Sequence, residues 1–161
     1  MKNDTCFVSL CTSTRPYSKS LKWKKFIEKL DNIDLIVCSN GGIIPIEFEN
    51  CYPYLTYDAH GERKYDNLYI KITYARLKLF FEKFPYKNII FNFRPNLRNR
   101  ICALKLKQEY KGNIYIYPSI NAYNLSRKNK FKPYSSYFPD LSYESMEELE
   151  KILKIIEGSE K

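Results

Sequence analysis

The chain has 161 residues, 44% of them hydrophobic and 28% charged, a composition that fits one folded domain and excludes a disordered or fibrous protein. Its formal net charge is +9, and a basic domain of this size attracts polyanions, of which nucleic acid is the commonest. A basic proteome or an acidic partner is the alternative, and we expect a single domain over 1–161.

The first half of the chain predicts two buried strands around one helix. Nearly continuous apolar runs at 5–10 and 33–39 are typical of strands buried on both faces. Between them, Ser18 or Ser20 can cap a helix. After the second strand, 41–62 shows no helical period and predicts a long ordered loop.

The second half predicts three more helices and two more strands. Helices are expected over 66–84 and 95–110 and from about 142, with strands at 88–93 and 114–118 and an irregular basic stretch over 119–139. The capping-box pattern at Ser145 and Glu148 marks the start of the last helix. The apolar positions expected to face the core are Leu68, Ile72, Ala75, Leu79, Phe80, Leu97, Ile101, Leu104, Leu149, Ile152, Leu153 and Ile156.

Apolar strands that alternate with amphipathic helices predict an α/β fold, a three-layer sandwich with a mainly parallel sheet. Ligands of such folds bind where the carboxyl ends of the strands meet. We therefore expect the site among four strand exits, at 10–23, 39–42, 94–96 and 118–119.

Cys11 is the candidate nucleophile of the first strand exit. A thiol beside a helix N-terminus and a cation such as Arg15 favours the thiolate form. Nearby hydroxyls and backbone N–H groups can hold an anion. The competing interpretation is a small buried cysteine in an ordinary polar turn.

The second strand exit offers a flexible backbone and acids. Asn40, Gly41 and Gly42 follow the strand, and glycine allows close approach of a ligand. Neither a dinucleotide glycine pattern nor a phosphate-binding lysine motif is present. The candidate acids for proton transfer or amine binding are Glu47, Glu49 and Asp58, which are otherwise exposed loop carboxylates.

Arginines and lysines interleaved with aromatic residues suggest an RNA-binding surface, because aromatics stack on bases and cations meet phosphates. A solvated charged face is the alternative. The candidate cations are Arg94, Arg98, Arg100, Arg127, Lys128, Lys130 and Lys132.

Several classes of site are not expected. The five cysteines form no C-x-x-C pair and there is one histidine, His60, so we expect no zinc site, no disulfide framework and a reducing, cytoplasmic setting. No signal peptide is predicted, and no run approaches the roughly 20 apolar residues that span a membrane. We see no site for a metal or nucleotide cofactor.

Two stretches resemble archaeosine synthase, a relative of archaeal tRNA-guanine transglycosylase. CTSTRPYSKSLKW (11–23) has its signature of Cys, three residues, Lys or Arg-Pro-Tyr, two residues, Ser, two residues and then usually His. GIIPIEFENCYPYLTYD (42–58) is similar to a second segment of the same domain. Trp23 stands where the family has His, and Leu10 where it usually has Pro.

The resemblance implies an α/β domain similar to uracil-DNA glycosylases and a specific reaction. The family adds the ε-amine of free lysine to the nitrile of 7-cyano-7-deazaguanine in tRNA, and a radical S-adenosylmethionine enzyme then converts the amidine adduct. The transglycosylase-like and PUA domains of the full-length enzymes are not part of this chain, so a partner subunit or a basic surface of its own is expected to hold the tRNA. The motif positions carried over are Cys11, Arg15, Pro16, Tyr17 and Ser20.

In the mechanism that we expect, the Cys11 thiolate adds to the nitrile and lysine then displaces it. Tyr17 contacts the base, and Glu47 or Asp58 binds or deprotonates the amine. Ser13, Ser20 and helix N–H groups stabilise the developing anion. Two rival hypotheses are a non-catalytic tRNA-binding accessory subunit and a glycosylase-type hydrolase that uses Asn40.

Overall fold

The apolar runs form a mainly parallel sheet in the computed structural model, which describes residues 3–51, 66–134 and 139–159. Within these residues the sheet has five strands in the order β3-β2-β1-β4-β5. Neighbouring strands pair in parallel except β3, which runs antiparallel to β2 at one edge. The strands are β1 (Thr5–Leu10), β2 (Asp34–Ser39), β3 (Gly42–Pro45), β4 (Asn88–Asn92) and β5 (Asn113–Tyr117).

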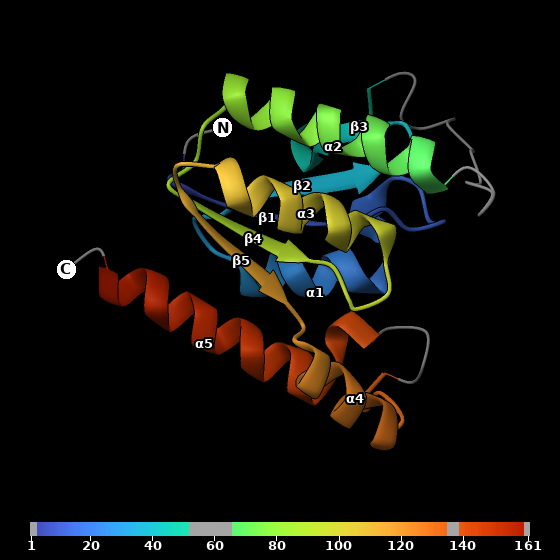
Figure 1. Cartoon of the computed structure of the whole chain (residues 1–161). Coiled ribbons are helices and arrows are strands. Elements are labelled where there is room, and N and C mark those ends of the chain that lie inside the picture. The colour runs from blue at the N-terminus through green and yellow to red at the C-terminus, as the bar shows by residue number, and fades with distance from the viewer. Residues whose placement is uncertain (1–2, 52–65, 135–138, 160–161) are drawn as a thin grey trace.

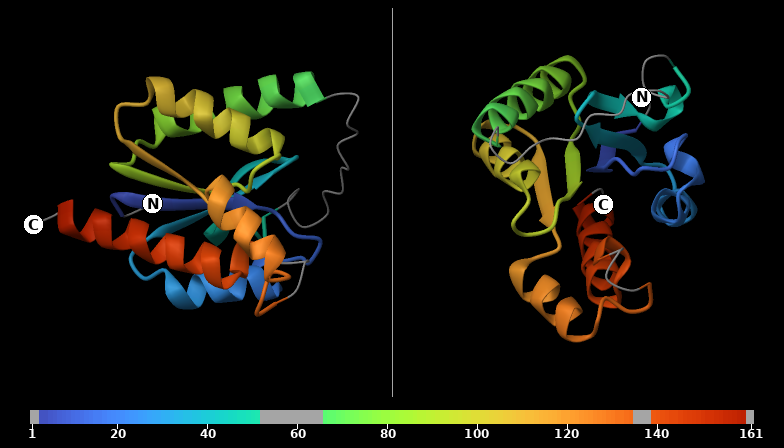
Figure 2. Two further views of the ribbon diagram at one scale, coloured as in Figure 1. Left: turned by 60° about the horizontal axis from the view of Figure 1, so that its bottom comes forward. Right: turned by 90° about the vertical axis from the view of Figure 1, so that its right-hand side faces the viewer.

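Helices cover both faces of this sheet, so the molecule has three layers (Figures 1 and 2). One face carries α2 (Asp66–Lys83) and α3 (Arg98–Glu109), and the other carries α1 (Leu21–Lys29) and α5 (Tyr143–Ser159). The short helix α4 (Ile120–Lys128) follows β5 and lies beside the start of α5. The predicted α/β fold with three layers is confirmed.

Each face of the sheet has its own core. Alternation along β1 sends Val8 toward α2 and α3, and Phe7 toward α1 and α5. Trp23 and Phe26 of α1 pack on Phe7, and all three side chains are fully buried. Burying an aromatic or aliphatic side chain stabilises the fold by roughly 1.5–3 kcal/mol. Buried apolar side chains on both faces therefore hold the sheet between its two helical layers.

The buried faces of α2 and α3 differ from the prediction. In α3, Ile101 and Leu104 are 44% and 48% exposed, whereas Cys102, Ala103 and Leu106 are buried. Each residue of a helix turns its side chain by about 100°, so the face through 102, 103 and 106 excludes 101 and 104 from the core. In α2 the predicted Leu68, Ile72 and Leu79 are exposed, and the core takes Thr73, Leu77 and Phe81 instead.

Two segments predicted as irregular contain regular structure. The stretch after Pro118 begins with α4, whose N-cap is Ser119: its Oγ accepts a hydrogen bond from the Ala122 N–H at 3.2 Å. The predicted loop contains β3, which starts at Gly42 and pairs with β2. A tight turn at Asn40 and Gly41 joins the two strands. Both elements are short, and neither has an apolar period long enough to show in the sequence.

The last helix starts near Ser142, as predicted, but its cap is not Ser145. The Oγ of Ser142 accepts from the Ser145 N–H at 3.3 Å, so Ser142 caps α5. Ser145 is fully buried and donates its hydroxyl to the Pro139 carbonyl. The predicted stripe of Leu149, Ile152 and Ile156 is buried against the sheet, and Leu153 packs beside it partly exposed.

Candidate functional site

The parallel strands β2, β1, β4 and β5 all end on the same side of the sheet, which is called the carboxyl edge below. The predicted site residues were expected to meet there. In the register, Ser9 of β1 pairs with Val37 of β2 and with Asn92 of β4, and Asn92 pairs with Tyr117 of β5. The segments that follow these residues therefore start side by side. This confirms that the strand exits converge, and the contacts below show which side chains they bring together.

Cys11 is the first residue beyond β1 and extends the ladder with β2. Its N–H donates to the Cys38 carbonyl at 3.1 Å. Because strand residues alternate, Cys11 lies on the same face as Ser9, and it packs partly exposed against the core beneath α1 and α5. Of the other thiols, Cys6, Cys38 and Cys102 are buried. Cys11 is therefore the partly accessible thiol at the carboxyl edge.

A closed polar turn follows Cys11. Arg15 donates from its guanidinium to the Thr12 carbonyl, and its Cζ lies 4.4 Å from the ring centroid of Tyr17. Tyr17 is 1% exposed, and burial raises the pKa of its phenol while the Arg15 charge opposes that rise. The predicted Arg15 and Tyr17 thus form one stacked unit beside Cys11, whereas Ser13 is exposed.

Glu49 is the carboxylate that contacts the polar turn after Cys11. It is 7% exposed, and its Oε2 accepts a hydrogen bond from the Ser18 N–H at 2.8 Å. Its charge acts on the Tyr17 phenol, as does that of Cys11, and both contribute to raising the pKa of Tyr17. Glu49, one of three candidate acids in the loop, is thus on the same side of the molecule as the thiol.

Glu47 lies elsewhere, although it is only two residues away. It is exposed and lines a small pocket with Asp34 and Ile33, which stand at the start of β2. Since β3 runs antiparallel to β2, the chain has returned from the carboxyl end of β2 toward its amino end by Pro45, which pairs with Ile36. The structure therefore separates Glu47 from Cys11, and Asp58 lies outside the described residues.

Ser20 and Trp23 have structural contacts. Ser20 caps α1, with its Oγ accepting from the Trp23 N–H at 3.3 Å, and it is 6% exposed. Trp23 is fully buried against Phe7 and Phe26. The position where the resembling family has His thus faces the core beneath the sheet.

The predicted glycine pair forms the turn between β2 and β3. Gly42 has φ +148°, a conformation that favours glycine, and no atom lies within 4 Å of where a Cβ would stand. The N–H of Gly41 donates to the Ser39 Oγ at 2.9 Å, and the Asn40 carbonyl accepts from Arg76 at 2.9 Å. This turn lies at the carboxyl edge, beside the exit of β1.

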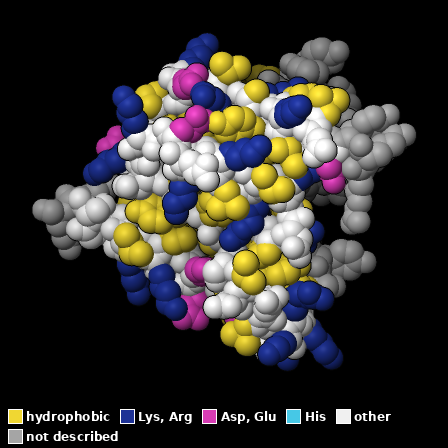
Figure 3. All heavy atoms as spheres, viewed as in Figure 1, with side chains coloured by type: hydrophobic (Ala, Val, Ile, Leu, Met, Phe, Trp, Pro, Cys, Tyr) yellow, Lys and Arg dark blue, Asp and Glu magenta, His cyan; other side chains and the backbone are white. Residues whose placement is uncertain are grey.

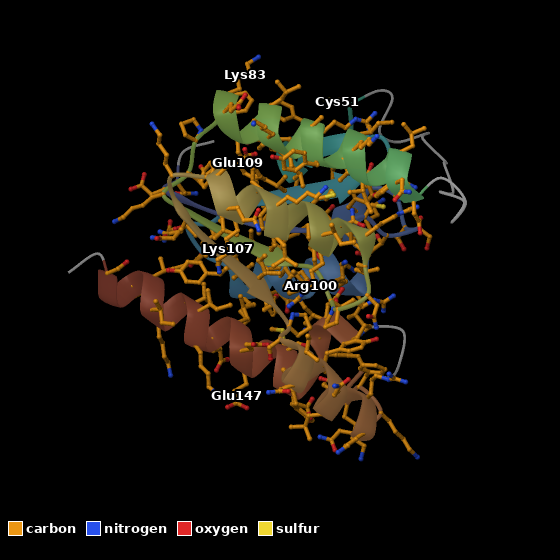
Figure 4. All side chains as sticks on the ribbon, viewed as in Figure 1. Cys51, Lys83, Arg100, Lys107, Glu109 and Glu147 are labelled. Carbon is orange, nitrogen blue, oxygen red and sulfur yellow. The ribbon has the colours of Figure 1, made fainter. Side chains whose placement is uncertain are left out.

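Two of the predicted RNA-binding arginines are held by the protein. Arg98 pairs with Asp66 at 2.7 Å and stacks on Tyr69 with its Cζ 3.5 Å from the ring centroid. Arg100 donates to the carbonyls of Phe93 at 2.7 Å and Pro118 at 2.8 Å, just beyond β4 and β5 (Figure 4). Burial lowers the pKa of the Arg100 guanidinium.

The other predicted cations are displayed on the surface. Arg94 is partly exposed just after β4. Four exposed cations cluster at the end of α4 and in the turn after it, and Lys and Arg side chains are seen there in Figure 3. These are Arg127, Lys128, Lys130 and Lys132.

Sequence reasoning missed a buried pair at the strand ends. The Ser9 hydroxyl donates to the Asn92 Oδ1 at 2.9 Å, with both residues almost fully buried. On the α2 side, Asn99 donates to the Tyr69 hydroxyl at 3.0 Å and approaches the Cys38 sulfur at 3.6 Å. The sequence signal that could have found this pair is a polar residue near the end of an otherwise apolar strand, which occurs at Ser9 and at Asn92.

The described residues contain no group of three or more His, Cys, Asp or Glu side chains placed to hold a metal ion. No helix within the ranges described above is long and apolar enough to cross a membrane.

Comparison with known proteins places the chain in a family of uncharacterised function. No curated protein matches it. It is similar to a solved structure, "Crystal structure of AF0587, a protein of unknown function", with a TM-score of 0.66 and 18% sequence identity, which shows a shared fold. The similarity covers 93% of this chain and 44% of that chain, so this chain spans less than half of its neighbour's length. A family model matches residues 1–126, and the chain belongs to that family, the domain of unknown function DUF5591.

Proposed function

We propose that the chain modifies tRNA by adding the ε-amine of lysine to the nitrile of 7-cyano-7-deazaguanine, as its resemblance to archaeosine synthase implies. The observation that carries the proposal is the position of Cys11. It is a partly exposed thiol at the carboxyl edge of a parallel sheet, the edge where such folds bind ligands. Arg15 stacks on Tyr17, and the charges of Arg15, Cys11 and Glu49 all act on the Tyr17 phenol.

The thiol supplies covalent catalysis in this mechanism. The Cys11 thiolate adds to the nitrile carbon, one π bond of the C≡N group breaks, and the nitrogen takes up a proton to give a thioimidate. The neutral lysine amine then attacks the same carbon. The thiolate leaves, the amine loses a proton, and the amidine remains.

Proton transfer and charge stabilisation fall to groups around the thiol. Glu49, buried and held by the Ser18 N–H, supplies the carboxylate that binds the lysine ammonium or accepts its proton. Arg15 supplies a positive charge for the nitrogen that becomes negative as the thiolate adds. Ser20 is left out of this scheme because its hydroxyl caps α1.

The exposed cations at the end of α4 provide the contact with RNA in this proposal. Arg127, Lys128, Lys130 and Lys132 are solvent-exposed, as phosphate contacts require. Arg98 and Arg100 have protein partners and contribute through the fold instead.

A second candidate function is that of a non-catalytic tRNA-binding subunit in an assembly with a transglycosylase-like protein. Trp23 supports it, because the position of the family's His is taken by an indole with no exposed surface. If that His carries a proton in the relatives, this chain lacks the carrier at that position and depends on a partner for activity.

The experiment that tests the covalent step is peptide mass spectrometry after incubation with 7-cyano-7-deazaguanine and no amine. We expect a thioimidate adduct on the peptide that contains Cys11, and its loss when lysine is added afterwards, because the amine displaces the thiol. Cys51→Ala is the matched control, since Cys51 is the exposed thiol and does not belong to the motif around Cys11. An adduct on Cys51 alone, or on no cysteine, contradicts the covalent mechanism.

A further inference from the structure

Strand β5 forms one edge of the sheet and directs part of its backbone away from the neighbouring strand. The N–H of Asn113 donates to the Lys87 carbonyl at 2.8 Å, so the backbone of Asn113 faces β4. In a parallel ladder every second residue turns both its N–H and its C=O to the same neighbour. Ile114 and Ile116 therefore point these groups the other way, and within the described residues no strand lies on that side.

This edge is open between two helices. In Figure 1 β5 runs between α3 and α5 on the side that faces the viewer, and Figure 3 shows hydrophobic side chains on the same face. Tyr115 and Ile116 are partly exposed. An open edge can pair with another strand, and charged residues or proline usually prevent this. The five residues of β5 include neither.

Exposed apolar side chains flank the edge on the α3 side. Ile101 and Leu104 lie on the face of α3 that is turned away from the core, and about half of each side chain is exposed. Together with Ile120, at the start of α4, they line a surface hollow. Leu104 stands at the middle of α3, just as Tyr115 stands at the middle of β5.

The α5 side of the edge carries a further apolar side chain. Glu148 marks the side of α5 that faces β5, because its Oε2 accepts from the N–H of Ser119, two residues beyond the strand, at 2.7 Å. Ile155 follows Glu148 by two helical turns, so it shares that side, and it is 57% exposed. Two turns advance about 10 Å, and α5 runs back along β5 (Figure 1), which brings Ile155 level with the middle of the strand.

We infer that β5 pairs with β5 of a second copy of this chain, in antiparallel orientation, so that the two sheets become one. A twofold axis beside Tyr115 sets Ile114 opposite Ile116 of the second copy, and Ile116 opposite Ile114. Opposed residues whose groups point at each other exchange two hydrogen bonds, so these two pairs form four. Tyr115 opposes itself as the unbonded pair, which fits the direction of its own groups toward β4.

Self-complementarity favours a second copy over an unrelated strand. A twofold axis brings identical residues near the axis together, so a surface that is apolar at its middle covers itself. Leu104 and Ile155 flank the middle of β5 on its two sides, and each meets the same residue of the second copy, α3 against α3 and α5 against α5. Strand pairing alone buries little area, and the helices add to it toward the roughly 800 Å² per copy of a stable complex.

The dimer leaves both candidate sites accessible. Because the two β5 strands run in opposite directions, the carboxyl edges of the two copies face opposite ways. Cys11 follows β1, which β4 separates from the paired edge. The inference therefore stands apart from the proposed reaction, and the tests below need neither lysine nor tRNA.

Cross-linking tests the position of the axis. A residue on the axis faces itself, and the Cα atoms of an unbonded antiparallel pair lie about 4.5 Å apart, within the range that a disulfide bridges. Tyr115→Cys, in a Cys11→Ala and Cys51→Ala background oxidised with diamide, should therefore give a covalent dimer on a non-reducing gel. Asn113→Cys in the same background is the matched control. It should stay monomeric on the gel, because Asn113 opposes Tyr117 and not itself.

Analytical ultracentrifugation of the full chain measures the dimer directly. We expect wild type to dimerise at concentrations up to about 100 μM, and Leu104→Lys to weaken the dimer at least about tenfold, because it places two ammonium groups together near the axis. Leu79→Lys is the matched control: Leu79 is exposed on α2, in the same helical layer, and the dissociation constant should not change.

Three results overturn the inference: a wild-type chain that stays monomeric, a dimer that Leu104→Lys does not weaken, and equal cross-linking of Tyr115→Cys and Asn113→Cys. A monomer that binds a different protein through this edge likewise overturns it and assigns the edge to that protein. If Tyr115→Cys does not fold, as checked by circular dichroism, Ile155→Lys takes its place and should weaken the dimer as Leu104→Lys does.

Discussion

At the residue scale, the chemistry of this molecule depends on how differently its five cysteines are placed. Burial raises the pKa of Cys38 to about 12 and that of Cys102 to about 11, and it raises the pKa of Cys6 as well. These three thiols remain protonated at neutral pH and behave as small apolar side chains. Cys11 and Cys51 reach solvent, and Cys11 directly follows β1 and bonds to the end of β2.

Alkylation of the native chain with iodoacetamide at about pH 8 should therefore label Cys11 and Cys51 and spare the other three, because the reagent attacks accessible thiolates. Peptide mass spectrometry over a time course measures this order. Because burial raises the pKa of Cys102 to about 11 and that of Cys38 to about 12, and neither side chain has exposed surface, both should stay unlabelled at this pH for as long as the chain is folded. In denaturant all five should react, and labelling of Cys38 before Cys11 in the native chain would contradict the assignment.

At the scale of elements, Arg100 links three parts of the fold at the site. From α3 it donates to the carbonyls of Phe93 and Pro118, which are the first carbonyls beyond β4 and β5. Asn92 and Tyr117 are the last residues of these strands, so the arginine holds the backbone just beyond them. Arg100 was predicted to contact RNA, but its guanidinium forms hydrogen bonds to two backbone carbonyls of the protein. The sequence pattern does not reveal these long-range bonds.

Arg100→Ala should lower the free energy of unfolding by about 1–3 kcal/mol, because two buried carbonyls lose a charged donor. Urea unfolding followed by circular dichroism measures the change. Lys107→Ala is the matched control on the same helix: its side chain is exposed, and the expected change is within about 0.5 kcal/mol (Figure 4). Equal stability of the two variants would mean that water replaces the guanidinium.

The elements that the sequence predicted and those it did not differ in one physical respect. The strands at 5–10, 33–39, 88–93 and 114–118 have mostly buried or partly buried side chains on both faces, so their apolar runs are nearly continuous and easily recognised. The short β3 and α4 are held by tertiary pairing and by a single cap, and their own composition is mixed. Local pattern therefore found the four parallel strands, including β5 at one edge of the sheet, and missed the short antiparallel β3 at the other edge and the short helix α4.

The same limit applies to the candidate site. Cys11, Arg15 and Tyr17 could be predicted because they follow a recognisable strand within one short motif. The choice of Glu49 over Glu47 depends on where β3 ends, and no spacing rule gives that. Asn92 is brought to Ser9 by a register that joins residues 83 positions apart.

At the scale of the whole molecule, the positive charge determines how the proposed RNA contact should behave. The chain carries a net charge of +9, with exposed cations at the end of α4. It spans 44% of the length of the structurally similar protein. In the proposed function this basic surface binds RNA mainly through phosphates, so affinity should fall as salt rises, and recognition of one position in tRNA is proposed to fall to the site or to a partner.

The measurement that tests the central claim most directly is mass spectrometry of nucleosides from tRNA bearing 7-cyano-7-deazaguanine after incubation with free lysine. The chain is used alone and with a transglycosylase-like partner, beside Cys11→Ala and the control Cys51→Ala. We predict a lysine adduct with wild type and Cys51→Ala, and loss of the adduct in Cys11→Ala while tRNA binding is retained. An adduct formed by Cys11→Ala at the wild-type rate would contradict the account, and tRNA binding with no adduct under either condition would favour the accessory subunit.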